Sequence, residues 1–383
     1  HDFRPDYARL GEVRRALAPA RTLALTATAT HAVREDICRA LALEQPARFV
    51  AGFDRPNLFL EVCAVRSEAQ KHEALAALLR RDGCGIVYTA TRKGAEKIAR
   101  LLRERGHAAL CYHAGLDDEE RRRTHEAFRA GAGVVVATNA LGMGLDKPDI
   151  RFVAHFELPR SVEAYYQEIG RAGRDGQPAH ALLLFNYADA AIQERLIALS
   201  HPTELVLRDV WEYLRQRPVV QEPVEALARA VGARAPLVVA ALKLLEQAGH
   251  VERGGAGEAS CAIRLLRAPS DVSLPPRATA QRAALAALAA AVGTGPANEV
   301  FLDRLAERAG LTEEGMRRAV AALASAEILQ FRPAFTGRVI RVLEPSLDAS
   351  ALRVNMRLVR WQEARERALL EKMVAYARGR GCR

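Results

Sequence analysis

The sequence predicts an α/β protein with a parallel sheet, followed by two small helical modules with short β extensions. Up to about residue 200, short and continuous apolar runs alternate with stretches of helical spacing. After that point, the helical pattern of residues 227–253 occurs a second time at 305–332. Apolar strands that alternate with helices are typical of a parallel sheet covered by helices on both faces.

The elements of the first half follow in a regular order. The expected strands lie at 21–28, 56–65, 84–91, 108–115, 133–140 and 151–158, and the expected helices at 31–43, 68–81, 92–106 and 117–130. In an open sheet of this kind, ligands bind beyond the carboxyl ends of the strands. We therefore expect functional residues in the loops that follow these strands.

The internal repeat predicts two similar modules in the second half. Gly232 of the first copy matches Gly310 of the second, and each copy reads helix, glycine turn, helix and β extension. This is the layout of a winged helix, and we place the two modules at 203–267 and 278–345, joined by a linker. Two unrelated helical bundles are the alternative interpretation.

The second helix of a helix-turn-helix is the one that meets DNA. In the first copy this helix, at 235–248, is nearly all apolar, so we expect a structural role or a protein contact. In the second copy, at 312–326, it carries Arg317 and Arg318. The second copy is therefore the predicted DNA-binding module.

Composition limits the class of protein. The chain has 383 residues and a formal net charge of +10, which favours a polyanionic partner. No apolar run reaches the roughly 18 residues that a membrane-spanning helix needs, so we expect no membrane partner. The six cysteines include no C-x-x-C pair, which favours reduced thiols in a cytoplasmic protein.

Small or polar residues follow several of the predicted strands. They are Thr26 and Thr28, Thr89, His113, and Thr138 with Asn139. Such side chains suit phosphodiester oxygens because they donate hydrogen bonds without bulk, although threonine also caps helices routinely. Next come a glycine-rich turn that includes Gly144, the pair Asp146 and Lys147, and then Gln167, Arg171 and Arg174 among glycines.

These last stretches resemble motifs V and VI of superfamily 2 helicases, and most closely those of the RecQ DNA helicase family. The resemblance extends from the first residue to about Asn186. It includes an aromatic-rich loop at 1–7, motif III at 23–30, the start of the second motor domain at 53–58 and motif IV at 85–102. It implies RecA-like motor domains, of which 1–52 would be the remnant of the first and 53–200 the second.

The resemblance implies an ATP-dependent 3′→5′ DNA helicase that acts in recombination and repair. Its substrates would be single-stranded and forked DNA, with single-strand DNA-binding protein and other repair proteins as further candidate partners. The protein would be cytoplasmic and associated with a bacterial nucleoid. The alternatives are a non-catalytic winged-helix DNA-binding regulator, or another superfamily 2 nucleic-acid translocase.

The resemblance also implies roles for individual residues. The catalytic candidates are Arg171, Arg174 and Gln167, with Arg174 the better candidate for an arginine finger and one of the pair serving to brace the loop. The nucleotide-binding candidates are Gly144, Asp146, Arg171 and Arg174, and the coupling candidates are Thr26 and Thr28. The DNA-binding candidates are His1, Phe3, Arg4, Thr89, His113, Thr138, Asn139 and Lys147.

Two motifs of such motors are missing from the sequence. Neither a G-x-x-x-x-G-K-[ST] phosphate loop nor a D-E-x-[HD] carboxylate pair occurs. We expect both to lie upstream of His1, together with the ligands of ATP and Mg²⁺. The acidic stretch at 117–120 is interpreted as the first turn of a helix. The chain by itself is therefore expected not to hydrolyse ATP.

The last segment, 346–383, contains Met373 and Tyr376 and ends in Cys382 and Arg383. In RecQ proteins, a similar pattern leads into a zinc module with four cysteines. We therefore expect 200–345 to be an insertion ahead of a truncated zinc module. One cysteine cannot form a tetrahedral zinc site, so we expect no structural Zn²⁺ here and a frayed or loosely helical segment at 366–383. An ordinary cysteine on an arginine-rich tail is the alternative.

Overall fold

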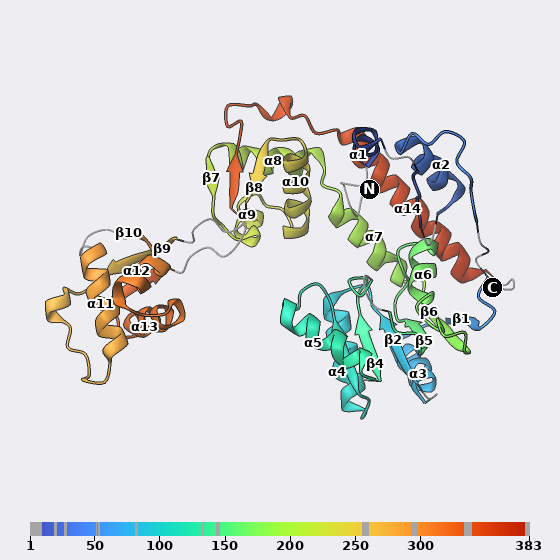
Figure 1. Ribbon diagram of the computed structural model, residues 1–383, viewed down its shortest axis with the longest axis horizontal. Coiled ribbons are helices and arrows are strands. Elements are labelled where there is room, and N and C mark those ends of the chain that lie inside the picture. Colours follow the sequence, from blue (N-terminus) through green and yellow to red (C-terminus); the bar gives the residue numbers. More distant parts are fainter. Residues whose placement is uncertain are drawn as a thin grey trace. The chain divides into compact units, whose positions relative to one another are not determined.

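The computed structural model describes residues 10–18, 21–26, 29–50, 52, 54–80, 83–131, 133–142, 146–254, 260–292, 298–332 and 339–379. The chain divides into two compact units (Figure 1). The first contains His1–Arg195 and Ala364–Arg383, and the second contains Leu196–Glu363. Among the described residues, no helix is both long and apolar enough to cross a membrane.

The first unit contains a six-stranded sheet in the order β1-β6-β5-β2-β4-β3. Its strands are β1 (Leu58–Ala64), β2 (Cys84–Tyr88), β3 (Ala109–Tyr112), β4 (Val134–Ala137), β5 (Ile150–His155) and β6 (Ala179–Phe185). Every neighbouring pair is parallel. The inner strands β2, β4 and β6 are buried along their whole length. The predicted parallel α/β sheet is thus confirmed.

Helices connect these strands, and most begin at a side-chain cap. They are α3 (Glu68–Leu79), α4 (Arg92–Glu104), α5 (Asp118–Arg129), α6 (Val162–Ile169) and α7 (Asp189–Ser200). The caps of the first four are Ser67, Thr91, Asp117 and Ser161. Asp117 and Glu120 form a capping box, so the acidic stretch at 117–120 is the start of a helix, as interpreted. Residues of α3 and α4 pack with the strands in one apolar cluster.

The strand expected at 21–28 is not present over the described residues 21–26. These residues lie between α1 (Leu10–Leu17) and α2 (His31–Ala40). Leu23 and Leu25 are 81% and 85% exposed. A strand needs a neighbour that completes its backbone hydrogen bonds, and among the described residues none pairs with this segment. The apolar pattern alone was therefore not sufficient to predict a strand.

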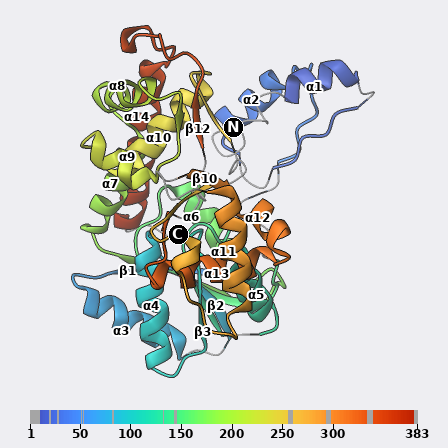
Figure 2. The same ribbon diagram turned by 90° about the vertical axis from the view of Figure 1, so that its left-hand side faces the viewer.

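The second unit contains two helical modules of similar layout. We call α8 (Glu204–Arg215), β7 (Val219–Val220), α9 (Val224–Ala230), α10 (Ala235–Gln247), β8 (Val251–Arg253) and β12 (Ile340–Val342) the first module. We call β9 (Ser260–Leu265), α11 (Thr279–Ala291), β10 (Asn298–Phe301), α12 (Leu302–Ala309), α13 (Glu313–Ser325) and β11 (Leu329–Arg332) the second module. Each has its own apolar core. Figure 1 and Figure 2 show the helices and strands of both modules. Gly232 and Gly310, with φ of +63° and +65°, make the matching turns.

The predicted boundaries at 203–267 and 278–345 differ from the structure in their third strands. β9, which was expected to extend the first module, pairs with β10 and β11 of the second. β12, which was expected to extend the second, pairs with β7 and β8 of the first. In Figure 1, β12 accordingly lies beside the much earlier strand β8. The segments 262–266 (AIRLL) and 339–343 (VIRVL) have the same apolar pattern, so the sequence could not indicate which strand belongs to which module.

The last helix, α14 (Met356–Arg378), is continuous. Met373 is fully buried, and the ring of Tyr376 lies 5.5 Å from that of Tyr165. Of the two expectations for this segment, frayed or loosely helical, the structure thus shows a helix over 366–378, which is held because these two side chains pack into the first unit. Cys382 lies outside the described residues.

His250 fastens the return segment from Glu344 to Arg353 onto the first module. Its side chain is fully buried. Its Nδ1 donates to Glu344 Oε2 at 2.8 Å, and its Nε2 accepts from the backbone N–H of Arg353 at 2.9 Å. The indole of Trp211 lies 5.6 Å from the imidazole and donates to the Leu347 carbonyl at 3.0 Å. This one histidine therefore holds both ends of the segment.

We expect His250→Phe to lower the free energy of unfolding of the second unit by about 1–3 kcal/mol, because the backbone N–H of Arg353 loses its acceptor. The Glu344 carboxylate loses one donor but keeps Arg353. The measurement is urea unfolding of the full chain, followed by tryptophan fluorescence. Both tryptophans of the chain, Trp211 and Trp361, belong to this unit.

His31→Phe is the control, because the His31 side chain is 78% exposed. Its effect should stay within about 0.5 kcal/mol. Equal midpoints for the two variants would contradict the role given to His250.

Candidate functional site

The loops that follow β2, β3 and β4 meet at one end of the sheet. Thr91 caps α4 by accepting from the Gly94 N–H at 3.0 Å. A Cβ on Gly115 would lie 3.1 Å from Nη1 of Arg92, so the loop after β3 contacts the start of α4. Arg92 and Lys93 are exposed here. The first turn of a helix also presents unpaired backbone N–H groups, so this end of the sheet suits an anion.

The predicted DNA-binding residues at these strand ends differ in accessibility. Thr89, His113 and Thr138 are buried, whereas Asn139 is exposed. His113 Nδ1 accepts from the Gly115 N–H at 3.2 Å, so its proton lies on Nε2, which is 3.1 Å from a carboxylate oxygen of Glu96. The buried residues therefore shape the loops. Arg92 and Lys93 are exposed cations that were not among the predicted site residues. They directly follow Thr89 and Thr91 at the end of a strand, and this position could have indicated a phosphate contact.

Lys147 does not lie in this group of exposed residues. Its side chain is 7% exposed. The Nζ atom is 3.1 Å from the Asp149 carboxylate and 5.8 Å from the centre of the Phe128 ring. A buried ammonium group needs such a partner. The contact of Lys147 with DNA therefore stays a prediction, and in the structure its ammonium group is paired with the partly exposed carboxylate of Asp149.

Arg171 and Arg174 follow α6, but their environments differ. Arg171 is buried, and its Nη2 donates to the carbonyl of Gly142. Arg171 also hydrogen-bonds the hydroxyl of Tyr88, and that hydroxyl donates to the Leu141 carbonyl at 3.1 Å. Burial raises the pKa of Tyr88 despite the nearby guanidinium, so the phenol stays neutral and donates. Arg171 therefore ties the loop after α6 to the loop after β4.

Arg174 is more accessible. Its side chain is 37% exposed, and Nη1 lies 2.8 Å from Oδ1 of Asp146, which is itself 86% exposed. An ion pair between groups this exposed is weak. The guanidinium can therefore exchange Asp146 for a more highly charged anion. Gln167, which lies on α6 ahead of this loop, is also exposed.

Arg55 and Asn57 hold the backbone of the arginine loop. Arg55 donates to the carbonyls of Gly170, Ala172 and Gly173 at 3.3, 2.8 and 3.1 Å. Asn57 Nδ2 donates to the Gly173 carbonyl at 2.8 Å. Gly173 has a φ of +59°, and a Cβ on it would lie 2.5 Å from Asn57 Nδ2. Sequence reasoning had used this stretch only to mark the start of a domain.

Several predicted residues lie outside the described part of the chain. They are His1, Phe3, Arg4, Thr28, Gly144 and Cys382. Thr26 is described and exposed. Within the described residues, no group of three or more His, Cys, Asp or Glu side chains could hold a metal ion.

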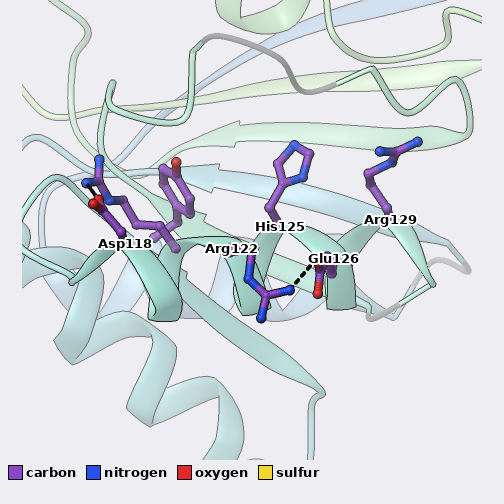
Figure 3. A pocket seen from close by; sticks show the side chains of 7 residues that line it. Asp118, Arg122, His125, Glu126 and Arg129 are labelled. Atoms are coloured by element: carbon purple, nitrogen blue, oxygen red, sulfur yellow. Dashed lines mark hydrogen bonds and ion pairs between the residues drawn. The ribbon is translucent and has the colours of Figure 1, made fainter.

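A groove of about 390 Å³ runs along α5, starting at Tyr112 next to His113. Its lining residues are Tyr112, Asp118, Arg121, Arg122, His125, Glu126 and Arg129. Figure 3 shows His125 and Arg129 extending to the same side of the helix. Arg121 pairs with Asp118, and Arg122 pairs with Glu126 at 2.8 Å. The groove thus carries mixed charge.

The comparisons with known proteins agree with this geometry. Residues 70–176 match the family described as "Helicase conserved C-terminal domain". The chain is 45% identical over 199 residues to the ATP-dependent DNA helicase RecQ of Pasteurella multocida, covering 51% of this chain and 31% of that protein. The matched part of the chain is thus similar to RecQ DNA helicases and contains a helicase C-terminal domain.

Other relatives show similar coverage. The probable ATP-dependent DNA helicase RecS of Bacillus subtilis is 41% identical over 219 residues, which cover 56% of this chain and 44% of RecS. The chain thus spans less than half the length of these RecQ relatives. Among solved structures, Saccharomyces cerevisiae Dbp5 bound to RNA and ADP BeF3 is 26% identical, with a TM-score of 0.41 over 49% of this chain and 51% of that one. The residues that match the helicase C-terminal domain lie in the first unit, which contains the six-stranded parallel sheet.

Proposed function

We propose that this chain contributes the second motor domain of an ATP-dependent 3′→5′ DNA helicase that acts in recombination and repair. The observation that carries the proposal is the pair of arginines after α6, with Arg171 buried as a brace and Arg174 accessible. The RecQ relatives are named ATP-dependent DNA helicases, which supports the use of ATP and Mg²⁺. A non-catalytic winged-helix regulator would leave the helicase match at 70–176 without a role.

In this proposal, Arg174 is the arginine finger. During phosphoryl transfer, negative charge spreads over the oxygens of the γ-phosphate, and a positioned guanidinium stabilises it. The weak pair with Asp146 keeps the Arg174 side chain extended until a nucleotide replaces the carboxylate. Arg55, Asn57 and Arg171 keep the backbone of the loop in place meanwhile. Gln167, Asp146 and Gly144 are proposed to contribute to the same nucleotide site.

Arg174→Ala in the full-length protein should lower ATP turnover by about 10³- to 10⁵-fold. Binding of ATP and of DNA should change little, because the ground state needs this side chain less than the transition state. A steady-state ATPase assay with saturating single-stranded DNA measures the loss.

Arg123→Ala is the matched control, because Arg123 is an exposed arginine that pairs with Glu119 on α5 of the same domain. Its turnover should equal that of the unchanged protein. Near-normal turnover in Arg174→Ala would overturn the finger assignment.

We also propose that single-stranded DNA crosses the ends of β2, β3 and β4. Asn139, Arg92 and Lys93 would contact phosphates, while Thr89, His113 and Thr138 shape the loops beneath. His1, Phe3 and Arg4 are proposed to couple this DNA to the ATP site, with Thr26 and Thr28. Forked DNA, single-strand DNA-binding protein and other repair proteins are proposed as partners of a cytoplasmic, nucleoid-associated enzyme.

Arg92→Ala should weaken single-stranded DNA binding and make it less dependent on salt. For single strands, the slope of log K against log salt changes by about 0.7 per lost phosphate contact. Fluorescence anisotropy with an unstructured oligonucleotide at several salt concentrations measures the slope. Arg100→Ala is the control, because Arg100 lies on the same helix and is 72% exposed, near Glu104. An unchanged slope for Arg92→Ala would remove Arg92 from the DNA path.

Zinc is a further part of the proposal. Cys382 would bind one Zn²⁺ together with three cysteines downstream of this chain. A longer chain should then contain one zinc per molecule by metal analysis, and Cys382→Ser should lose it. Unchanged zinc content in that variant would exclude Cys382 as a ligand.

A further inference from the structure

The two modules of the second unit exchange their third strands. β9 follows β8 in the chain but forms the centre of the β10-β9-β11 sheet. β12 follows β11 in the chain but forms the centre of the β7-β12-β8 sheet. Both exchanged strands run antiparallel to their partners. β9 follows the first module in the sequence but completes the sheet of the second. β12 follows the second module in the sequence but completes the sheet of the first.

The two exchanged strands occupy equivalent places. Val342 lies opposite Val251 in the first module, and Leu265 lies opposite Leu329 in the second. Beyond these pairs, the Leu343 N–H donates to the His250 carbonyl at 3.0 Å, and the Leu266 N–H donates to the Ile328 carbonyl at 2.9 Å. Because the register is the same, Arg264 of β9 and Arg341 of β12 hold matching positions.

The charges around the two matching arginines differ. Arg341 Nη1 donates to Glu252 at 3.1 Å, which lies opposite it on β8. Arg264 lies opposite Gln330, which carries no charge. Arg264 and the nearby Arg267 are exposed, and neither side chain has a hydrogen bond or ion pair within the part of the chain that the structure describes. Among the described side chains, the matching arginine thus has a carboxylate partner in the first module and none in the second.

The helix predicted to meet DNA is electrically balanced. Arg317 pairs with Glu313 at 2.6 Å, and Arg318 lies 3.8 Å from Glu314. Both glutamates lie in the first turn of α13, the end that enters the major groove in a helix-turn-helix. Each of these two arginines thus has a carboxylate beside it, which a phosphate would have to displace.

We infer that β9 and the residues directly after it form a phosphate-binding wing of the second module, where Arg264 on β9 and Arg267 beyond it contact the backbone of duplex DNA. Exposed arginines without a carboxylate partner are suited to phosphate oxygens, and such contacts position a module without reading sequence. The inference deepens the DNA-binding part of the proposed function and is independent of ATP chemistry.

The double variant Arg264→Ala/Arg267→Ala in the full chain tests the contact. For a blunt 20-base-pair duplex, the slope of log K against log salt should become shallower by about 2, since each phosphate contact contributes about 0.9. Arg341→Ala is the control at the matching position and should leave the slope unchanged. Equal slopes for the double variant and the unchanged chain would overturn the inference, and so would an equal loss in the control.

A single-stranded 20-mer separates this inference from the proposed DNA path on the motor. Its affinity should be unaffected by the double variant and reduced by Arg92→Ala. If the double variant weakens the single strand but not the duplex, the wing is not a duplex contact. Failure of the motor proposal would appear instead as missing DNA-stimulated ATP turnover in the full-length protein.

Disulfide trapping tests the exchange itself. Glu252→Cys/Arg341→Cys places two cysteines opposite each other on β8 and β12, and directly opposite residues are close enough to be bridged. Oxidation should give an intramolecular disulfide, detected by peptide mass spectrometry. Glu252→Cys/Arg264→Cys should give none, because β9 lies in the other sheet. A disulfide in Glu252→Cys/Arg264→Cys and none in Glu252→Cys/Arg341→Cys would overturn the exchange. Disulfide-linked dimers of Glu252→Cys/Arg341→Cys would also overturn it.

Discussion

The loop from Gly170 to Arg174 keeps its shape because side chains from distant parts of the chain hold its polar groups. Arg55 and Asn57 bind its carbonyl oxygens, and the buried Arg171 guanidinium binds the carbonyl of Gly142. A buried guanidinium is costly unless it is hydrogen-bonded, so these contacts define one arrangement of the loop. The accessible position of Arg174 depends on that arrangement.

The sheet and α6 of the first unit also help to position the loop from Gly170 to Arg174. The parallel sheet brings the carboxyl ends of β2, β4 and β5 together, which places Tyr88 beneath the loop after β4. His155, at the end of β5, lies 2.7 Å from the Glu168 carboxylate on α6 and stacks on Tyr88. His155 thus attaches α6, the helix before the arginine loop, to the sheet. Tyr88 holds the loop after β4 through the Leu141 carbonyl.

Much of this could be predicted from the sequence, because a continuous apolar run reports burial on both faces of a strand. The runs at 84–91 and 133–140 became β2 and β4 for that reason. The run at 21–28 has the same local pattern, but a strand also requires a neighbour, and a local pattern carries no information about neighbours.

For the candidate site, the sequence indicated which residue types handle phosphate but not which of them are accessible. The residue types at Arg171 and Arg174 indicated a phosphate-handling loop, but only the fold shows that one is buried and the other accessible. Lys147 looked like a phosphate ligand because lysine usually is exposed, and its burial beside Asp149 depends on the packing of Phe128. Arg55 carried no signal, because its partners are backbone carbonyls that are 115 or more residues away.

The shared pattern of β9 and β12 has a consequence for how the second unit can change over evolutionary time. A segment that contributes a strand to its neighbour cannot be lost, duplicated or transferred alone. Removal of residues 278–345 would take β12 out of the first sheet and leave β9 without β10 or β11. The two modules are therefore a single heritable unit, although each has its own core and each repeats the layout of the other.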